Sequence, residues 1–147
     1  MTKQKLRASG LAAFLCFAVV VAAGCPKGAL VLLRDGAVTN QSFERAVTTA
    51  HHDLDANGQP FVDDATERTL LEISRKIAQA DDSAVSLYEK NDKAGALVQV
   101  TNCITAIDDA LGNGLLGVKN LSKKNEISAL LLSLRGGLMT AKAMLSN

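Results

Sequence analysis

Apolar residues recur every three or four positions along much of this 147-residue chain, and this spacing strongly limits its possible folds. The pattern places apolar side chains on one face of an α-helix, where a neighbouring helix can cover them. It covers four stretches, at residues 40–56, 63–90, 97–111 and 122–145. Because such amphipathic helices are unstable alone and short connections favour antiparallel neighbours, we predict an all-α, up-and-down bundle of about four helices.

The residues that form these stripes are the predicted core. Burying about twenty such side chains, at roughly 1.5–3 kcal/mol each, is enough to oppose the entropy of the chain. They are Phe43, Ala46, Val47, Ala50, Leu54, Leu70, Ile73, Ile77, Ala80, Ala84, Leu87, Leu97, Val100, Ile104, Ile107, Leu111, Ile127, Leu131, Leu134, Leu138, Ala141 and Leu145.

Local signals predict where these helices begin and end. Gly36 predicts a stop after a short apolar patch at residues 29–33, which fits a helical turn or a strand equally well. Asp64 and Glu67 have the spacing of a capping box, which predicts a helix start there. Ser122 predicts the N-cap of the last helix. We therefore expect the bundle to begin only after the stop at Gly36.

The first 25 residues differ in composition from the rest of the chain. Lys3, Lys5 and Arg7 form a basic start with no acidic residue nearby. An uncharged apolar run follows at residues 11–23, which is shorter than the roughly 20 residues that span a bilayer. A basic start, a short apolar run and an exit of small residues are typical of a secretory signal peptide.

The exit of this run reads Ala-Ala-Gly-Cys and ends at Cys25. It resembles the lipobox of bacterial lipoprotein precursors, in which small residues precede an invariant cysteine. The resemblance covers residues 1–25, and Ala22 stands where leucine is commoner. It implies cleavage before Cys25, a diacylglycerol on the Cys25 thiol and an acyl chain on its new amino group. The alternatives are an ordinary signal peptide cut after Ala23 or Gly24, which leaves the Cys25 thiol free, and an uncleaved N-terminal anchor.

Two or more acyl chains anchor a protein stably, so this resemblance implies attachment to a membrane of the bacterial cell envelope. Pro26, rather than aspartate, follows the cysteine, which favours the periplasmic face of the outer membrane in a Gram-negative cell. The chain then divides into a signal peptide (1–24), a lipid-attachment site with an N-terminal segment (25–39) and a helical bundle domain (40–147).

The charge of the mature chain argues against a nucleic-acid partner. Three of the 16 basic residues lie in the signal peptide, which leaves 13 against 15 acidic residues and a net charge of about −2. Nucleic-acid binders usually carry a basic excess, and aromatic residues, on which bases stack, make up only 3% of this chain. Cys103 is left without a disulfide partner and is interpreted as a small buried apolar residue.

Residues 53–64 resemble an EF-hand calcium loop placed between two predicted helices. Calcium takes six to eight oxygen ligands, and Gly58 supplies the sharp turn of such a loop. Pro60 and Phe61 depart from the pattern, and no sister loop is visible. The same residues also suit a helix end, a proline turn and an N-cap at Asp63 or Asp64. The candidate calcium ligands are Asp53, Asp55, Asn57, Gln59 and Asp64.

Other polar motifs have structural interpretations. His51 and His52 fit the last turn of a helix, although His51 with Asp55 has the spacing of a weak transition-metal pair. The G-x-G-x-x-G letters at 112–117 lie between helices rather than after a strand, which predicts a loop. The aspartate pairs at 81–82 and 108–109 are interpreted as solvated helix faces.

Two residues of the last predicted helix do not fit its core stripe. Leu132 falls on the polar side and stacks one turn before Gly136, although glycine inside a helix costs about 1 kcal/mol. Together they predict a flat contact surface for another helix, from a protein partner or a second copy. The alternative is a wide core stripe.

We therefore expect a lipid-anchored protein of the bacterial cell envelope that acts as a non-catalytic interaction or structural helical module. It contains no recognised catalytic motif, no resident cofactor beyond the lipid on Cys25, and no signal for nucleic-acid binding. One alternative is a calcium- or metal-binding envelope protein that uses the 53–64 loop. The other is an enzyme with an unrecognised site.

Overall fold

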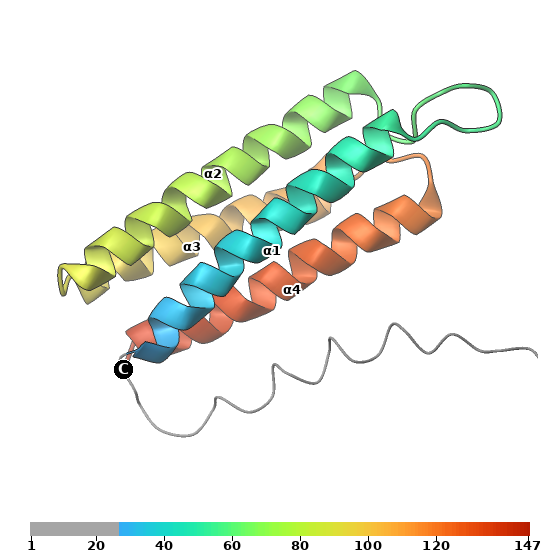
Figure 1. The fold of residues 1–147 in the computed structure, drawn as a ribbon. Coiled ribbons are helices and arrows are strands. Elements are labelled where there is room, and N and C mark those ends of the chain that lie inside the picture. The colour runs from blue at the N-terminus through green and yellow to red at the C-terminus, as the bar shows by residue number, and fades with distance from the viewer. Residues whose placement is uncertain (1–26) are drawn as a thin grey trace, which may run out of the picture.

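A computed structural model describes residues 27–147 of the chain. They form an up-and-down bundle, so the predicted all-α fold is confirmed (Figure 1). The expected signal peptide and lipid-attachment residue lie outside the described residues. In order, the helices are α1 (Lys27–His52), α2 (Asp64–Glu89), α3 (Lys93–Asp109), with its π-helical continuation η2 (Ala110–Gly114), and α4 (Leu121–Leu145).

No helix within residues 27–147 is long and apolar enough to cross a membrane.

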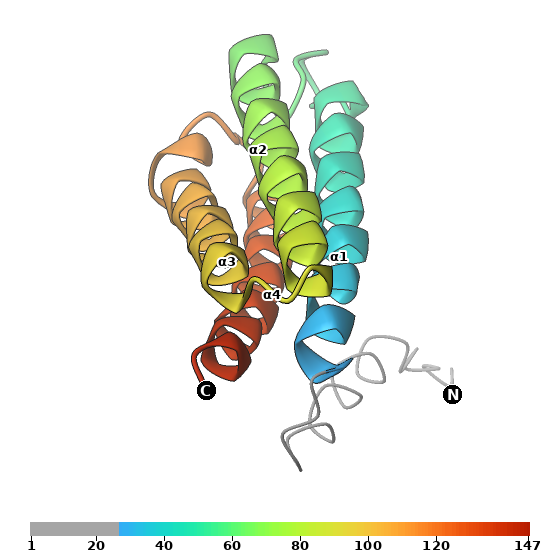
Figure 2. The ribbon, with the colours of Figure 1, turned by 90° about the vertical axis from the view of Figure 1, so that its left-hand side faces the viewer.

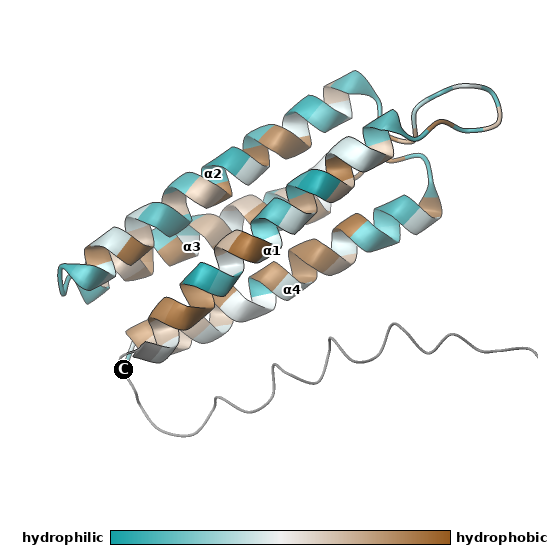
Figure 3. Ribbon diagram, in the orientation of Figure 1, coloured by the Kyte–Doolittle hydropathy of each residue, from teal (hydrophilic) through white to brown (hydrophobic). Residues whose placement is uncertain are grey.

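Each helix packs against two neighbours. Helix α1 contacts α2 and α4, and α3 contacts the same two helices, so the four surround one core (Figure 2). The predicted stripes face this core, with the polar faces outward (Figure 3). Leu54 is an exception at 59% exposure, because α1 ends before it. The largest side chains that are almost fully buried include Leu33, Phe43, Leu70, Ile77, Ile107, Ile127, Leu131 and Leu138.

The predicted stop at Gly36 is wrong, because α1 runs unbroken from Lys27 to His52. Gly36 is itself buried, and a Cβ at this position would lie 3.5 Å from Leu134 on α4. The three-four spacing therefore continues through the glycine, from the buried Leu33 to the buried Asn40. Packing against α4 outweighs the roughly 1 kcal/mol that glycine costs inside a helix.

Two predicted caps are also displaced along the chain. Asp63, rather than Asp64 of the predicted capping box, caps α2 by accepting a hydrogen bond from the Thr66 amide at 2.8 Å. Asn120, not Ser122, caps α4. Aspartate, asparagine and serine are about equally good N-caps, so residue type does not decide between neighbouring candidates. The point at which the chain turns into the helix decides which residue is the cap.

Gly114 packs closely against α2, at the point where α3 has continued into η2 and leads into the connection to α4. A Cβ at this position would lie 2.9 Å from Leu70 on α2. The G-x-G-x-x-G letters at 112–117 thus lie in a helical end and an interhelical connection, as predicted, and Gly114 serves close helix packing.

We expect Gly36→Ala to raise the free energy of unfolding by about 1 kcal/mol, because alanine favours helix and the new methyl group meets Leu134 at ordinary contact distance. Urea denaturation measures this gain. Gly137→Ala, at a helical position with nothing within 4 Å, is the matched control and should gain a similar amount. A loss of stability in Gly36→Ala alone would show that the packing against α4 leaves no room.

Candidate functional site

The loop between α1 and α2 is held together largely by one carboxylate. Asp55 Oδ1 accepts hydrogen bonds from the backbone amides of Asn57 at 2.8 Å and Gln59 at 2.9 Å. These amide donors lower the pKa of the Asp55 carboxyl. Gly58 adopts a positive φ of 75°, which the turn requires and glycine permits. Asp55 thus shapes the turn, and Asn57 and Gln59 are exposed on it.

The other candidate calcium ligands point to different partners. Asp53 Oδ2 lies 2.9 Å from the ammonium group of Lys123 on α4, and this hydrogen bond raises the pKa of Lys123. Asp64 is the first residue of α2, and its exposed carboxylate lies 3.8 Å from His51. Within residues 27–147, no three His, Cys, Asp or Glu side chains gather closely enough to hold a metal ion.

His51 links the end of α1 to the segment that precedes α2. Its Nδ1 lies 2.9 Å from the carbonyl oxygen of Val62, so Nδ1 carries the proton and donates. Its Nε2 lies 3.5 Å from Glu67 and 3.8 Å from Asp64. His51 is thus directed to this cluster rather than to the predicted partner Asp55, which holds its own turn.

The two loops at this end of the bundle are paired. Val62 and Val118 form an isolated antiparallel bridge, and both are buried. The Lys119 amide donates to the Phe61 carbonyl at 2.9 Å. Together with the Asp53–Lys123 ion pair, these bonds fasten the α1–α2 loop to the start of α4.

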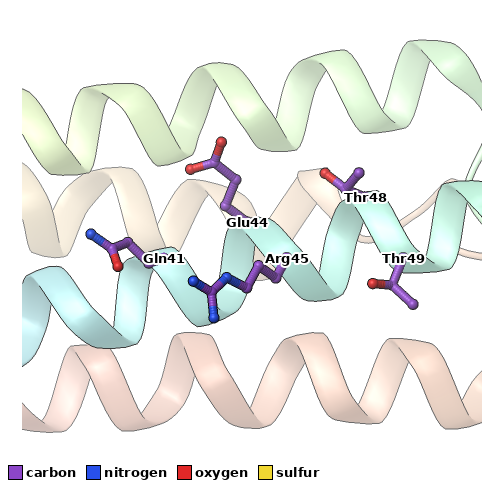
Figure 4. Close-up of a pocket in the computed structure, with 5 residues that line it drawn as sticks. All are labelled: Gln41, Glu44, Arg45, Thr48 and Thr49. Atoms are coloured by element: carbon purple, nitrogen blue, oxygen red, sulfur yellow. The ribbon is translucent and has the colours of Figure 1, made fainter.

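The surface hollows lined by described residues are shallow and open to solvent. One follows α1 alone, and all five side chains that line it project from that helix (Figure 4). A second lies between α2 and α3 around Ser86 and Gln99. A third surrounds His51, beside Glu67 and Arg68 of α2. The lining of each hollow is that of an ordinary charged or polar helix surface. The residues in Figure 4 are Gln41, Glu44, Arg45, Thr48 and Thr49.

A polar pair crosses the core between α1 and α2. The side-chain amide of Asn40 donates to the backbone carbonyl of Ser74 at 3.0 Å, and the Ser74 hydroxyl donates to Asn40 Oδ1 at 3.3 Å. Both residues are at most 4% exposed. A buried pair of this kind disfavours other alignments of two helices, because any shift would leave polar groups unpaired.

Asp81 corrects the interpretation of residues 81–82 as a solvated pair. Asp81 is 3% exposed, and its Oδ1 has no hydrogen-bond partner. Burial, with a smaller contribution from the Asp82 charge, raises its pKa to about 7. Its position four residues after Ile77 places it on the core stripe of α2, which is the signal that sequence reasoning missed. Asp82 is exposed, as predicted.

The thiol of Cys103 lies in the same part of the core. It is fully buried, as predicted, and its Sγ lies 3.6 Å from the carbonyl oxygen of Ile77. Burial and the nearby Asp81 raise the pKa of this thiol to about 12, so it is a poor nucleophile at neutral pH.

The outward face of α4 carries the two residues predicted to form a contact surface. Leu132 is 56% exposed, and Gly136, one turn later, is exposed with nothing within 4 Å of where a Cβ would stand. Leu130 is half-buried against the core and Leu131 is fully buried. The wide-stripe interpretation therefore applies to Leu130, whereas Leu132 and Gly136 lie on the surface.

Comparisons with known proteins found no match: no protein-family model, no curated protein and no solved structure is significantly similar to this chain.

We expect the stability of the protein to fall as the pH rises through about 7, because folding raises the pKa of Asp81 above its unfolded value. The folded state then retains a proton that the unfolded chain loses near pH 4. The stabilisation is complete below about pH 4 and is lost above the folded pKa, at about 1.4 kcal/mol per pKa unit.

Asp81→Asn, which cannot ionise, should flatten this pH dependence and be more stable than the wild type at pH 8. Urea denaturation at pH 5 and pH 8 measures both effects. Asp82→Asn is the matched control at an exposed position, and most of the pH dependence should remain in it. Equal slopes for the wild type and Asp81→Asn would show that Asp81 does not titrate in this range.

Proposed function

We propose that this chain is a lipid-anchored protein of the bacterial cell envelope, a non-catalytic helical module for interaction or structure. The observation that carries the proposal is the order of its first 25 residues. A basic start is followed by an uncharged apolar run at 11–23 and by small residues that lead directly to Cys25. Acyl chains on Cys25 would hold the bundle at a membrane.

The roles of the polar side chains support a non-catalytic module. Asp55 holds a turn, Asp63 caps a helix, and His51 binds a backbone carbonyl. Cys103 is buried, with a pKa raised to about 12. Each of these four groups thus has a role in the fold, and the hollow beside His51 is open to solvent.

The outward face of α4 is the proposed contact surface. Leu132 exposes more than half of its side chain to water, and Gly136 leaves a flat place beside it. Covering a leucine side chain gains roughly 1.5–3 kcal/mol, and a glycine lets another backbone approach closely. A helix of a protein partner, or of a second copy of this chain, fits such a surface.

The anchor is tested on native protein purified from membranes. Intact mass should match a chain that begins at residue 25 and carries a diacylglycerol and an acyl chain. Cys25→Ser should leave the membrane fraction or remain unprocessed. Cys103→Ala is the matched control and should stay in the membrane fraction, because Cys103 is buried in the core. A chain that begins at Met1, or an unmodified thiol at Cys25, would refute the anchor.

The contact surface is tested by crosslinking in intact membranes. Leu132→Glu should lose most of the crosslinked complex seen with the wild type, because a charge on this face opposes its burial. Val98→Glu, at a position on α3 with 57% exposure, is the matched control and should keep the complex. Loss in Val98→Glu with retention in Leu132→Glu would place the contact on another face.

A further inference from the structure

The folded body begins almost at the proposed anchor. Helix α1 starts at Lys27, two residues after Cys25. Two residues span at most about 7 Å, even when fully extended. If lipid is attached at Cys25, the end of the bundle that contains the start of α1 therefore lies within a few ångströms of the bilayer surface, without a long tether.

This end of the bundle, here called the proximal end, consists of residues 28–33 of α1 and 139–147 of α4. The two segments lie side by side, since a Cβ on Gly28 would stand 3.3 Å from the sulfur of Met144. The α2–α3 connection lies beside these segments, since Glu89, the last residue of α2, pairs with Arg34 of α1 at 3.4 Å. Figure 1 shows the α2–α3 connection at the same end of the bundle as the start of α1 and the end of α4.

The proximal end has no carboxylate side chain in either segment. Residues 28–33 are uncharged, and Lys142 is the one charged side chain in 139–147. Val31 is 51% exposed, and Ala143 is also exposed. The start of α1 is correspondingly brown, the colour of apolar residues, in Figure 3.

The opposite end, which we call the distal end, has the reverse character. Its α1–α2 loop and the start of α2 carry Asp53, Asp55, Asp63 and Asp64, of which Asp53 is paired with Lys123. Anionic lipid headgroups would repel these carboxylates, whereas they attract an apolar surface that carries a lysine. The two ends thus differ in charge. The segments next to Cys25 carry only Lys142, and Glu89 and Asp92 in the adjacent α2–α3 connection are balanced by Lys90 and Lys93, whereas residues 53–64 carry carboxylates and no lysine or arginine.

We infer that the bundle stands end-on on the membrane, with the proximal end in contact with lipid headgroups. This inference rests on the proposed lipid anchor. Val31 enters the boundary between headgroups and acyl chains, and Lys142 faces the phosphates. Because α1 has 26 residues, the distal end is held about 39 Å from the surface. The outward face of α4 then stands perpendicular to the membrane plane, outside the bilayer, and is open to neighbouring proteins at its side.

The orientation is tested on the full, natively lipidated protein in vesicles of phosphatidylethanolamine and phosphatidylglycerol. A fluorophore is placed on Ala143→Cys at the proximal end or on Leu116→Cys at the distal end, both exposed positions. Cys103 is buried, with a raised pKa, so it reacts slowly with the label. Lipids that carry a headgroup quencher should quench the Ala143→Cys label severalfold more than the Leu116→Cys label.

A second pair of variants tests the contact itself. Val31→Glu should weaken the quenching at Ala143→Cys, because a carboxylate is repelled by the anionic surface. Val98→Glu, at a similarly exposed valine on α3, should leave the quenching unchanged. Equal quenching at the proximal and distal labels in lipidated, membrane-bound protein would overturn the orientation while leaving the anchor intact. An unmodified thiol at Cys25 would instead overturn the proposed function, and the inference with it.

Discussion

The four helices stay together because each buries one apolar stripe that water would otherwise surround. The interaction between α1 and α4 shows this most clearly. The stripe of α1 passes through Gly36, which is buried beside Leu134 of α4. The gain from burying Ala29 and Leu33 on the far side of the glycine exceeds its local cost, so α1 remains one helix. The proximal end of the bundle exists only because of this continuity.

Two polar features interrupt the apolar core in opposite ways. Asn40 and Ser74 form hydrogen bonds with each other, so they favour one alignment of α1 and α2. Asp81 has an oxygen without a partner, and its burial is tolerated because its pKa is raised enough for it to hold a proton near neutral pH. The first feature specifies the fold, and the second makes its stability depend on pH.

The proposed role uses the bundle as a spacer with two different ends. A largely apolar end lies next to the proposed lipid at Cys25, and the more acidic α1–α2 loop lies at the far end. Between them, the outward face of α4 offers Leu132 and Gly136. The lipid would fix the location of the protein, and the length of the helices would set the height of the distal end above the membrane. The helix faces would provide the contacts with other proteins.

The sequence by itself determined the helical class, the approximate number of helices and most of the core, because the three-four spacing of apolar residues is local and periodic. It also contains the whole of the signal that suggests the anchor. Tertiary structure decided which signals were overridden. The predicted stop at Gly36 is overridden by packing against α4. Asp81 is buried because its neighbours on the stripe are buried, and the carboxylates of residues 53–64 contact separate partners. Lys123, the partner of Asp53, and Leu134, beside Gly36, lie on α4, far away in the sequence. The pairing of a side chain with so remote a segment leaves no periodic trace in the chain.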